Sequence, residues 1–143
     1  MILLDASPLI ALVAGEPGEP AVARLLANDE VVIPAPNLAE AVDYLTRRRG
    51  LPDAALRAAL EPLLAVSIKV LSTTSEQAWR AGLLRARHYH RAHRPVSIPD
   101  CLLLACADAD DTIVTSDRPL IAAARQEGIA VERVLDSRGE LPQ

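Results

Sequence analysis

Aromatic side chains are almost absent from this 143-residue chain, which has no Phe and in which aromatic residues make up 2% of the sequence. A hydrophobic core must therefore be built mainly from Leu, Val, Ile and Ala, within a hydrophobic content of 50%. That content is sufficient for one compact domain without disulfides or structural metals. The same scarcity argues against a surface that stacks nucleic-acid bases on aromatic rings.

Cysteine is also scarce, and the two that are present, Cys101 and Cys106, lie five positions apart in one apolar segment with a helical pattern. A helix keeps residues at this spacing from forming a disulfide, so both are expected in the core. No apolar run approaches the roughly 20 residues of a membrane-spanning helix. Asp5 interrupts the apolar start of the chain and no positively charged region precedes it, so a signal peptide is not expected. We expect a soluble cytoplasmic protein without membrane association.

Short apolar segments alternate with helical patterns along the whole chain. Strands are expected at residues 1–4, 31–33, 69–71, 112–115 and 129–134, with helix-start residues such as Ser7 and Pro8 between them. Strands separated by helices predict an α/β domain over residues 1–135, in three α/β/α layers around a central parallel sheet of about five short strands. Residues 136–143 are expected to form a polar C-terminal tail.

Four carboxylates lie at the boundaries of these elements. Asp5 directly follows the first strand, Glu40 is early in a helix, Asp100 adjoins a helix-starting proline, and Asp117 follows a late strand. In open parallel sheets, ligands bind beyond the carboxyl ends of the strands, where the strand order reverses. If the fold brings the four residues together there, they form an all-oxygen site of the kind that Mg²⁺ and Mn²⁺ prefer.

Each carboxylate also has a purely structural explanation. Asp5 and Asp117 each precede a helix and could cap it, Asp100 could complement a helix dipole, and Glu40 could face solvent. These explanations are independent of one another, so their joint occurrence at an ordered set of boundaries favours a single site.

The net charge of -4 would argue against an anionic partner, but the four carboxylates account for this excess. Outside them, acidic and basic residues balance, and bound divalent cations would neutralise the site itself. All basic residues but Lys69 are arginines, with clusters within residues 47–49 and 80–94, and arginine favours bidentate contacts with phosphate. A nucleic-acid substrate is therefore compatible with the charge, although each cluster could equally be a solvated helix face.

Four segments of the sequence resemble the acidic motifs of PIN-domain ribonucleases: ILLDAS at 2–7, NLAEAV at 37–42, SIPDCLLLACA at 97–107 and TIVTSDRPL at 112–120. More narrowly, the chain resembles VapC toxins of toxin–antitoxin pairs. The resemblance implies a Mg²⁺- or Mn²⁺-dependent endoribonuclease that cleaves RNA by metal-activated water, with Asp5, Glu40, Asp100 and Asp117 as catalytic and metal-binding residues. It also implies a homodimer and a small VapB-like antitoxin that binds apolar helices and blocks the site.

Hydroxyl groups beside two of these acids are further candidates, because members of the family often place a hydroxyl there to bond a carboxylate or a metal-bound water. They are Ser7, Thr115 and Ser116. The alternatives are helix capping for Ser7 and ordinary strand-end polarity for Thr115 and Ser116; we favour this alternative for Thr115 and leave it open for Ser116. We interpret Asn37 as a helix N-cap rather than a site residue. The family often has an aromatic residue shortly after the last Asp, whereas Arg118 follows it here.

Other polar clusters are expected to lie outside the site. His88, His90 and His93 do not share one helical face, so an exposed helix end is favoured over a basic rim for RNA, and a zinc site is disfavoured. The single tryptophan, Trp79, is expected in the core or in a dimer interface. The acidic residues between 108 and 111 are expected to form a solvated loop.

Two non-catalytic classes are the alternatives. A receiver-like signalling domain would need a phospho-accepting Asp after the third strand, where this chain has Leu71 and Ser72. A PIN-like binding module would keep the sheet and lose acids, whereas all four are present here.

Overall fold

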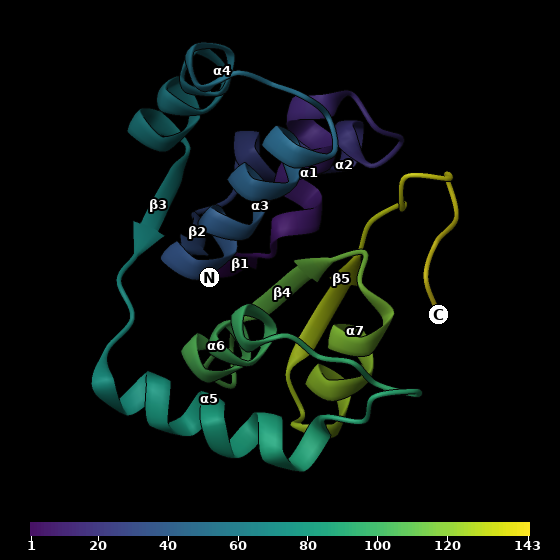
Figure 1. Cartoon of the computed structure of the whole chain (residues 1–143). Helices are drawn as coiled ribbons and strands as arrows, with labels where there is room; N and C mark the ends of the chain where they lie inside the picture. Colours follow the sequence, from purple (N-terminus) through teal and green to yellow (C-terminus); the bar gives the residue numbers. More distant parts are fainter.

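The computed structural model describes residues 1–143, which form a single five-stranded sheet with helices on both of its faces (Figure 1). The strands are β1 (Ile2–Leu4), β2 (Val31–Pro34), β3 (Ile68–Leu71), β4 (Thr112–Thr115) and β5 (Ala130–Arg133). The helices are α1 (Ala6–Ala14), α2 (Glu19–Asn28), α3 (Ala35–Arg47), α4 (Asp53–Val66), α5 (Ser75–His88), α6 (Ile98–Cys106) and α7 (Arg118–Gln126). The predicted three-layer fold is confirmed.

All neighbouring strands run parallel, in the order β3-β2-β1-β4-β5. The chain builds the sheet outward from β1 to β3 and then returns to the other side of β1 for β4 and β5. The order therefore reverses between β1 and β4, which is where parallel sheets place their ligand sites. A receiver-like domain is excluded, because doubly wound folds of that type have the order 2-1-3-4-5.

Alternation along the strands divides the core between the two faces of the sheet, because successive side chains point to opposite sides. Leu3, Val32 and Ile113 pack against α5, α6 and α7. Leu4 and Val114, their neighbours in sequence, pack on the opposite face against α1 to α4. Both faces are covered, which accounts for apolar strands with few polar positions.

Aliphatic residues fill this core, and the two cysteines belong to it as predicted, with Cys101 buried and Cys106 half-buried. The prediction for Trp79 is wrong where it placed the residue in the core, because its side chain is 73% exposed on α5. Asp111 is also not the solvated residue that was expected. It is buried and accepts a hydrogen bond of 2.9 Å from the backbone N–H of Asp108. None of the helices is both long enough and apolar enough to cross a membrane.

Gly18, at the start of α2, packs against the chain that follows β5. A Cβ atom there would lie 2.7 Å from the carbonyl oxygen of Leu135. Because a backbone carbonyl cannot move aside easily, we expect Gly18→Ala to lower the free energy of unfolding by about 1–3 kcal/mol. In α5, a Cβ atom on Gly82 would meet nothing within 4 Å. Gly82→Ala is therefore expected to raise the free energy of unfolding by about 0.5–1 kcal/mol. Urea unfolding measures both values, and equal effects would contradict the close contact at Gly18.

Candidate active site

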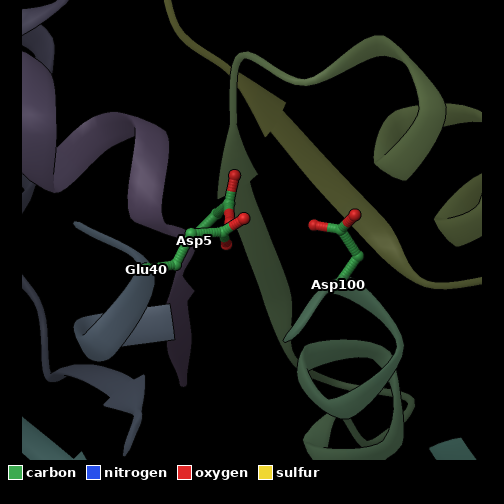
Figure 2. Close-up of side chains that lie close together, drawn as sticks. All are labelled: Asp5, Glu40 and Asp100. Carbon is green, nitrogen blue, oxygen red and sulfur yellow. The ribbon is translucent and has the colours of Figure 1, made fainter. Parts of the chain in front are cut away.

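A cleft of about 360 Å³ opens at the carboxyl edge of the sheet, and all four predicted carboxylates line it. Asp5 directly follows β1, and Asp117 lies two residues beyond β4. Glu40 comes from the second turn of α3 and Asp100 from the first turn of α6. Figure 2 shows Asp5 and Glu40 side by side, with Asp100 facing them across the cleft. The fold therefore brings together residues up to 112 positions apart in sequence.

Three of these acids can offer oxygen atoms to one cation. Asp5, Glu40 and Asp100 each have a carboxylate oxygen, and these oxygens lie within 4.8 Å of one another. Asp117 lines the same cleft but lies outside this group. Its Oδ2 atom accepts a 3.0 Å hydrogen bond from the backbone N–H of Leu120, so Asp117 also caps α7. Asp117 can therefore cap α7 with one carboxylate oxygen and still line the cleft.

Asp5 is the most strongly held of the four, since its two oxygens accept four hydrogen bonds. Its Oδ1 atom accepts from the backbone N–H of Ala6 at 2.6 Å and from the side-chain amide of Asn37 at 3.2 Å. Its Oδ2 atom accepts from the hydroxyls of Ser7 at 3.0 Å and Thr115 at 2.7 Å. These donors come from α1, α3 and β4, so three elements fix the orientation of one carboxylate.

The hydroxyl residues occupy different places around this carboxylate. Thr115 is fully buried and links two acids, because its oxygen also accepts the backbone N–H of Asp117 at 2.9 Å. Ser7 does not cap α1; Asp5 caps it, because the helix already begins at Ala6. The Ser7 oxygen instead accepts the backbone N–H of Ser116 at 3.1 Å. Ser116 contributes that N–H, while its hydroxyl has no hydrogen bond within the protein.

The interpretation of Asn37 as an N-cap is wrong. Pro34 occupies the N-cap position of α3, and Asn37 lies fully buried in the first turn with its amide donating to Asp5. Its orientation is determined by this contact, since a reversed amide would place two oxygens against each other. A usable signal was present in the sequence: Asn37 lies three residues before Glu40, which puts both on one helix face.

Burial and mutual repulsion raise the pKa values of three carboxyl groups. Loss of solvation, followed by repulsion from Asp5, raises the pKa of Asp100 to about 8 despite its hydrogen bond from the backbone N–H of Ser97. Burial, followed by repulsion from Asp5, Asp117 and Asp43, raises the pKa of Glu40 to about 7. Burial is also the main reason why the pKa of Asp117 rises to about 6. Carboxyl groups that share a site in this way favour a bound cation.

A family model for the PIN domain matches residues 2–131. This chain belongs to the PIN domain family. The match spans all five strands except the end of β5 and includes every residue of the cleft. A search of curated proteins found no match.

Solved structures similar to this PIN domain include VapC toxins. VapC20 of Mycobacterium tuberculosis, a toxin that cleaves the sarcin-ricin loop, aligns with a TM-score of 0.60 and 25% identity over 90% of this chain and 85% of that chain. VapBC2 of Rickettsia felis, bound to a promoter DNA fragment, aligns with a TM-score of 0.68 and 18% identity over 92% and 98%. FitAcB of Neisseria gonorrhoeae aligns with a TM-score of 0.61 and 26% identity over 92% and 96%. The resemblance inferred from the four motifs is confirmed at the level of the family.

A larger hollow in this PIN domain, of about 610 Å³, lies at the opposite edge of the sheet. It is lined by the start of β2, the start of β3 and the end of α4, and Asp29 and Glu30 are its acidic residues. Both are exposed, and neither belongs to a group of converging ligand atoms. Its volume exceeds that of the carboxylate cleft, but it lacks the convergent polar groups that mark a site.

Proposed function

We propose that this PIN domain is a metal-dependent endoribonuclease and acts as the toxin of a toxin–antitoxin pair in the cytoplasm. The observation that carries the proposal is the meeting of Asp5, Glu40 and Asp100 at the point where the strand order reverses, with Asp117 in the same cleft. The resemblance to VapC20, which cleaves the sarcin-ricin loop, supports RNA as the substrate class.

The residues of the cleft fit Mg²⁺ or Mn²⁺. Asp5, Glu40 and Asp100 provide only oxygen, and both ions prefer oxygen ligands and retain several waters. The raised pKa values of Glu40 and Asp100 mean that a cation would displace protons from this cluster. Such an ion would supply Lewis acidity, which lowers the pKa of water and so makes a hydroxide nucleophile available near neutral pH.

Hydrolysis adds the oxygen of water to phosphorus and releases one ester oxygen of the RNA backbone as an alcohol. One proton leaves the water, and one proton reaches the leaving oxygen. Asp5 would hold the cation in a fixed position, because four groups donate hydrogen bonds to its two carboxylate oxygens and so fix their orientation. Asp117 is suited to transfer a proton at Oδ1, since only Oδ2 is used in capping and its pKa is raised to about 6, near neutrality.

Incubation of the purified protein with total RNA in Mg²⁺ or Mn²⁺ tests the proposal, with EDTA as the control. We expect discrete cleavage products that EDTA abolishes, and mapping of the new ends identifies the RNA and the position of the cut. Intact RNA in both metals would favour a PIN-like module that binds without catalysis.

Asn37 offers a more specific test of the metal site. We expect Asn37→Ala to weaken Mn²⁺ binding by about 10- to 100-fold, the usual effect of removing a hydrogen bond that orients a ligand. Isothermal titration measures the affinity. The matched control is Asn28→Ala, since Asn28 is exposed and its side chain donates only to the backbone carbonyl of Arg24. Equal affinities for the two variants would show that the Asn37 contact does not organise the site.

We also propose an antitoxin and a second copy of this chain as partners. Structural neighbours solved as VapBC complexes, from Rickettsia felis and Salmonella typhimurium, support a small VapB-like antitoxin. The surface of α1 and α2, with the repeated Gly-Glu-Pro of residues 15–20 between them, is the proposed docking region. Co-purification with a short DNA-binding protein would support this partner.

A further inference from the structure

Residues 89–94 form a compact turn between α5 and α6. The backbone groups of His90 and Arg94 exchange hydrogen bonds of 2.8 and 2.9 Å, which closes the turn. The Nδ1 atom of His90 accepts from the backbone N–H groups of Ala92 and His93, and the rings of His90 and His93 stack at 4.5 Å. The turn is therefore exposed but internally well ordered.

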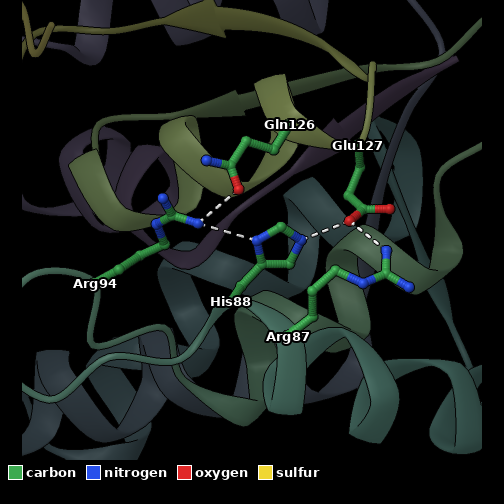
Figure 3. A network of polar contacts seen from close by, with 5 residues as sticks. All are labelled: Arg87, His88, Arg94, Gln126 and Glu127. Carbon is green, nitrogen blue, oxygen red and sulfur yellow. Dashed lines mark hydrogen bonds and ion pairs between the residues drawn. The ribbon is translucent and has the colours of Figure 1, made fainter.

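A buried histidine anchors this turn to the end of α7 (Figure 3). The Nε2 atom of His88 lies 2.5 Å from a carboxylate oxygen of Glu127, and the Nδ1 atom lies 3.1 Å from the guanidinium of Arg94. Since a guanidinium can only donate, Nδ1 accepts and Nε2 carries the proton that is given to Glu127. Arg94 also donates to the side chain of Gln126 at 2.8 Å. The expectation that these histidines form an exposed helix end is wrong for His88, which is 3% exposed.

Positive charge accumulates around the turn, and Glu127 is the one acid that pairs with it. Arg85, Arg91 and Arg94 make no ion pair, and Arg87 pairs with Glu127 alone. Elsewhere on the surface, five arginines have acids within 4.0 Å, namely Arg47, Arg49, Arg57, Arg118 and Arg138. Arg24, Arg48, Arg80, Arg125 and Arg133 make no ion pair, but they are spread over separate elements, whereas the arginines of the turn lie within ten residues of one another. A hollow of about 330 Å³ at the turn is lined by Arg87, His88, Tyr89, His90, His93 and Arg94, with no acidic residue among them.

The turn leads directly into the catalytic cleft. Pro95 and Ser97 line the cleft, and they follow Arg94 immediately in the chain. Three residues span at most about 10 Å, so the cationic turn lies close to the cleft wall. The cleft itself presents four acids, and Arg118, next to Asp117, is paired with Glu140 at 3.6 Å. The phosphates on either side of the cleaved bond therefore need basic side chains outside the cleft.

We propose that the turn of residues 89–94 binds the phosphate backbone of the RNA strand that enters the cleft, with Arg91 as its principal contact. Arg91 is exposed and has no hydrogen bond or ion pair, so its guanidinium is free for phosphate. The contacts of buried His88 with Arg94 and Glu127 hold the turn in position. This inference rests on the proposed function, because it assigns a surface for the substrate of the same site.

Binding of a fluorescein-labelled single-stranded RNA of mixed sequence tests the proposal by anisotropy, in Mg²⁺ and in the Asp5→Asn background, in which cleavage is expected to be too slow to interfere with the measurement. We expect Arg91→Ala to weaken binding by about five-fold or more at low salt and Arg91→Glu to weaken it further. The plot of log affinity against log salt concentration should become shallower, with the magnitude of its slope smaller by about 0.7 for the one lost phosphate contact. Arg24→Ala on α2 is the matched control, because Arg24 is exposed, makes no ion pair and lies across the sheet from the turn. It should bind RNA with unchanged affinity and slope.

The proposal is overturned if Arg91→Ala and Arg24→Ala change affinity equally, or if neither Arg91 variant changes it. Kinetics with the active protein distinguish this failure from failure of the proposed function. We expect Arg91→Ala to raise KM for a short RNA while kcat is retained. Absence of cleavage by the native chain, with RNA binding still dependent on Arg91, would refute the nuclease proposal alone. Normal cleavage with an unchanged KM in Arg91→Ala would refute only the proposal that the turn binds RNA.

Discussion

Replacement of Asp5 by asparagine is expected to lower the rate of RNA cleavage by about 10³-fold, equivalent to about 4 kcal/mol of transition-state stabilisation. Asparagine removes one of the three negative charges that can contact a single cation. It also replaces a carboxylate oxygen by an N–H donor among four groups that donate to it. Both changes act on the site with little change in side-chain volume, so the fold should be kept. Initial rates on a labelled RNA in saturating Mn²⁺ measure the effect.

Asp43 provides the control for this loss. It lies one turn beyond Glu40 on α3, is exposed, and pairs with Arg47 at 2.7 Å rather than with the cleft. Asp43→Asn removes the same charge from the protein, and we expect it to retain the native rate. If Asp5→Asn stays within ten-fold of Asp43→Asn, the four carboxylates are not the centre of the reaction.

The thermal stability of the metal-free protein is expected to decrease as the pH rises from about 4 to about 8. The pKa values of Asp117, Glu40 and Asp100 in the folded protein are about 6, 7 and 8, above their ordinary values of 3.8, 4.5 and 3.8. A group with a raised pKa contributes stability that is full below its unfolded pKa and is lost as the pH rises through its folded pKa. Carboxylates with lowered pKa values, such as Glu127, act below this window and in the opposite direction. We expect Tm to decrease by about 5–10 °C over the range, as measured by calorimetry in EDTA.

Divalent metal should reverse this trend, because it binds the ionised cluster in the folded protein. At a concentration 100 times its Kd, an ion adds about 2.7 kcal/mol, and this gain should be largest near pH 8. Asp100→Asn removes the most strongly perturbed group, so its Tm should depend less on pH and respond less to Mn²⁺. A metal-free Tm that is constant between pH 4 and 8 would contradict the repulsion inferred for the cleft.

The sequence was sufficient to predict the parts of the site that depend on topology. Alternating strands and helices imply a parallel sheet, and a parallel sheet places the residues after β1 and β4 at one edge. Asp5 and Asp117 could therefore be located before any contact was known. Glu40 and Asp100 followed from their places near the starts of helices, which point to the same edge.

The supporting contacts could not be predicted, because each depends on a side chain far away in the sequence. Asn37 donates to Asp5 across 32 positions, and Thr115 does so across 110. Local patterns favoured a cap for the first and ordinary strand-end polarity for the second. The prediction that His88 is exposed was wrong for the same reason, since its ring bonds the carboxylate of Glu127, 39 positions later.

The hydrogen bond from Thr115 to Asp5 also determines when the cleft can be completed during synthesis. Asp5 leaves the ribosome more than a hundred residues before β4 and Asp117. A nascent chain holds the first acid without the strand that orients it, and it cannot complete the cleft until most of the domain has emerged. If the proposed function holds, the nuclease is inert toward the messenger RNA being translated until most of its own domain has been synthesised.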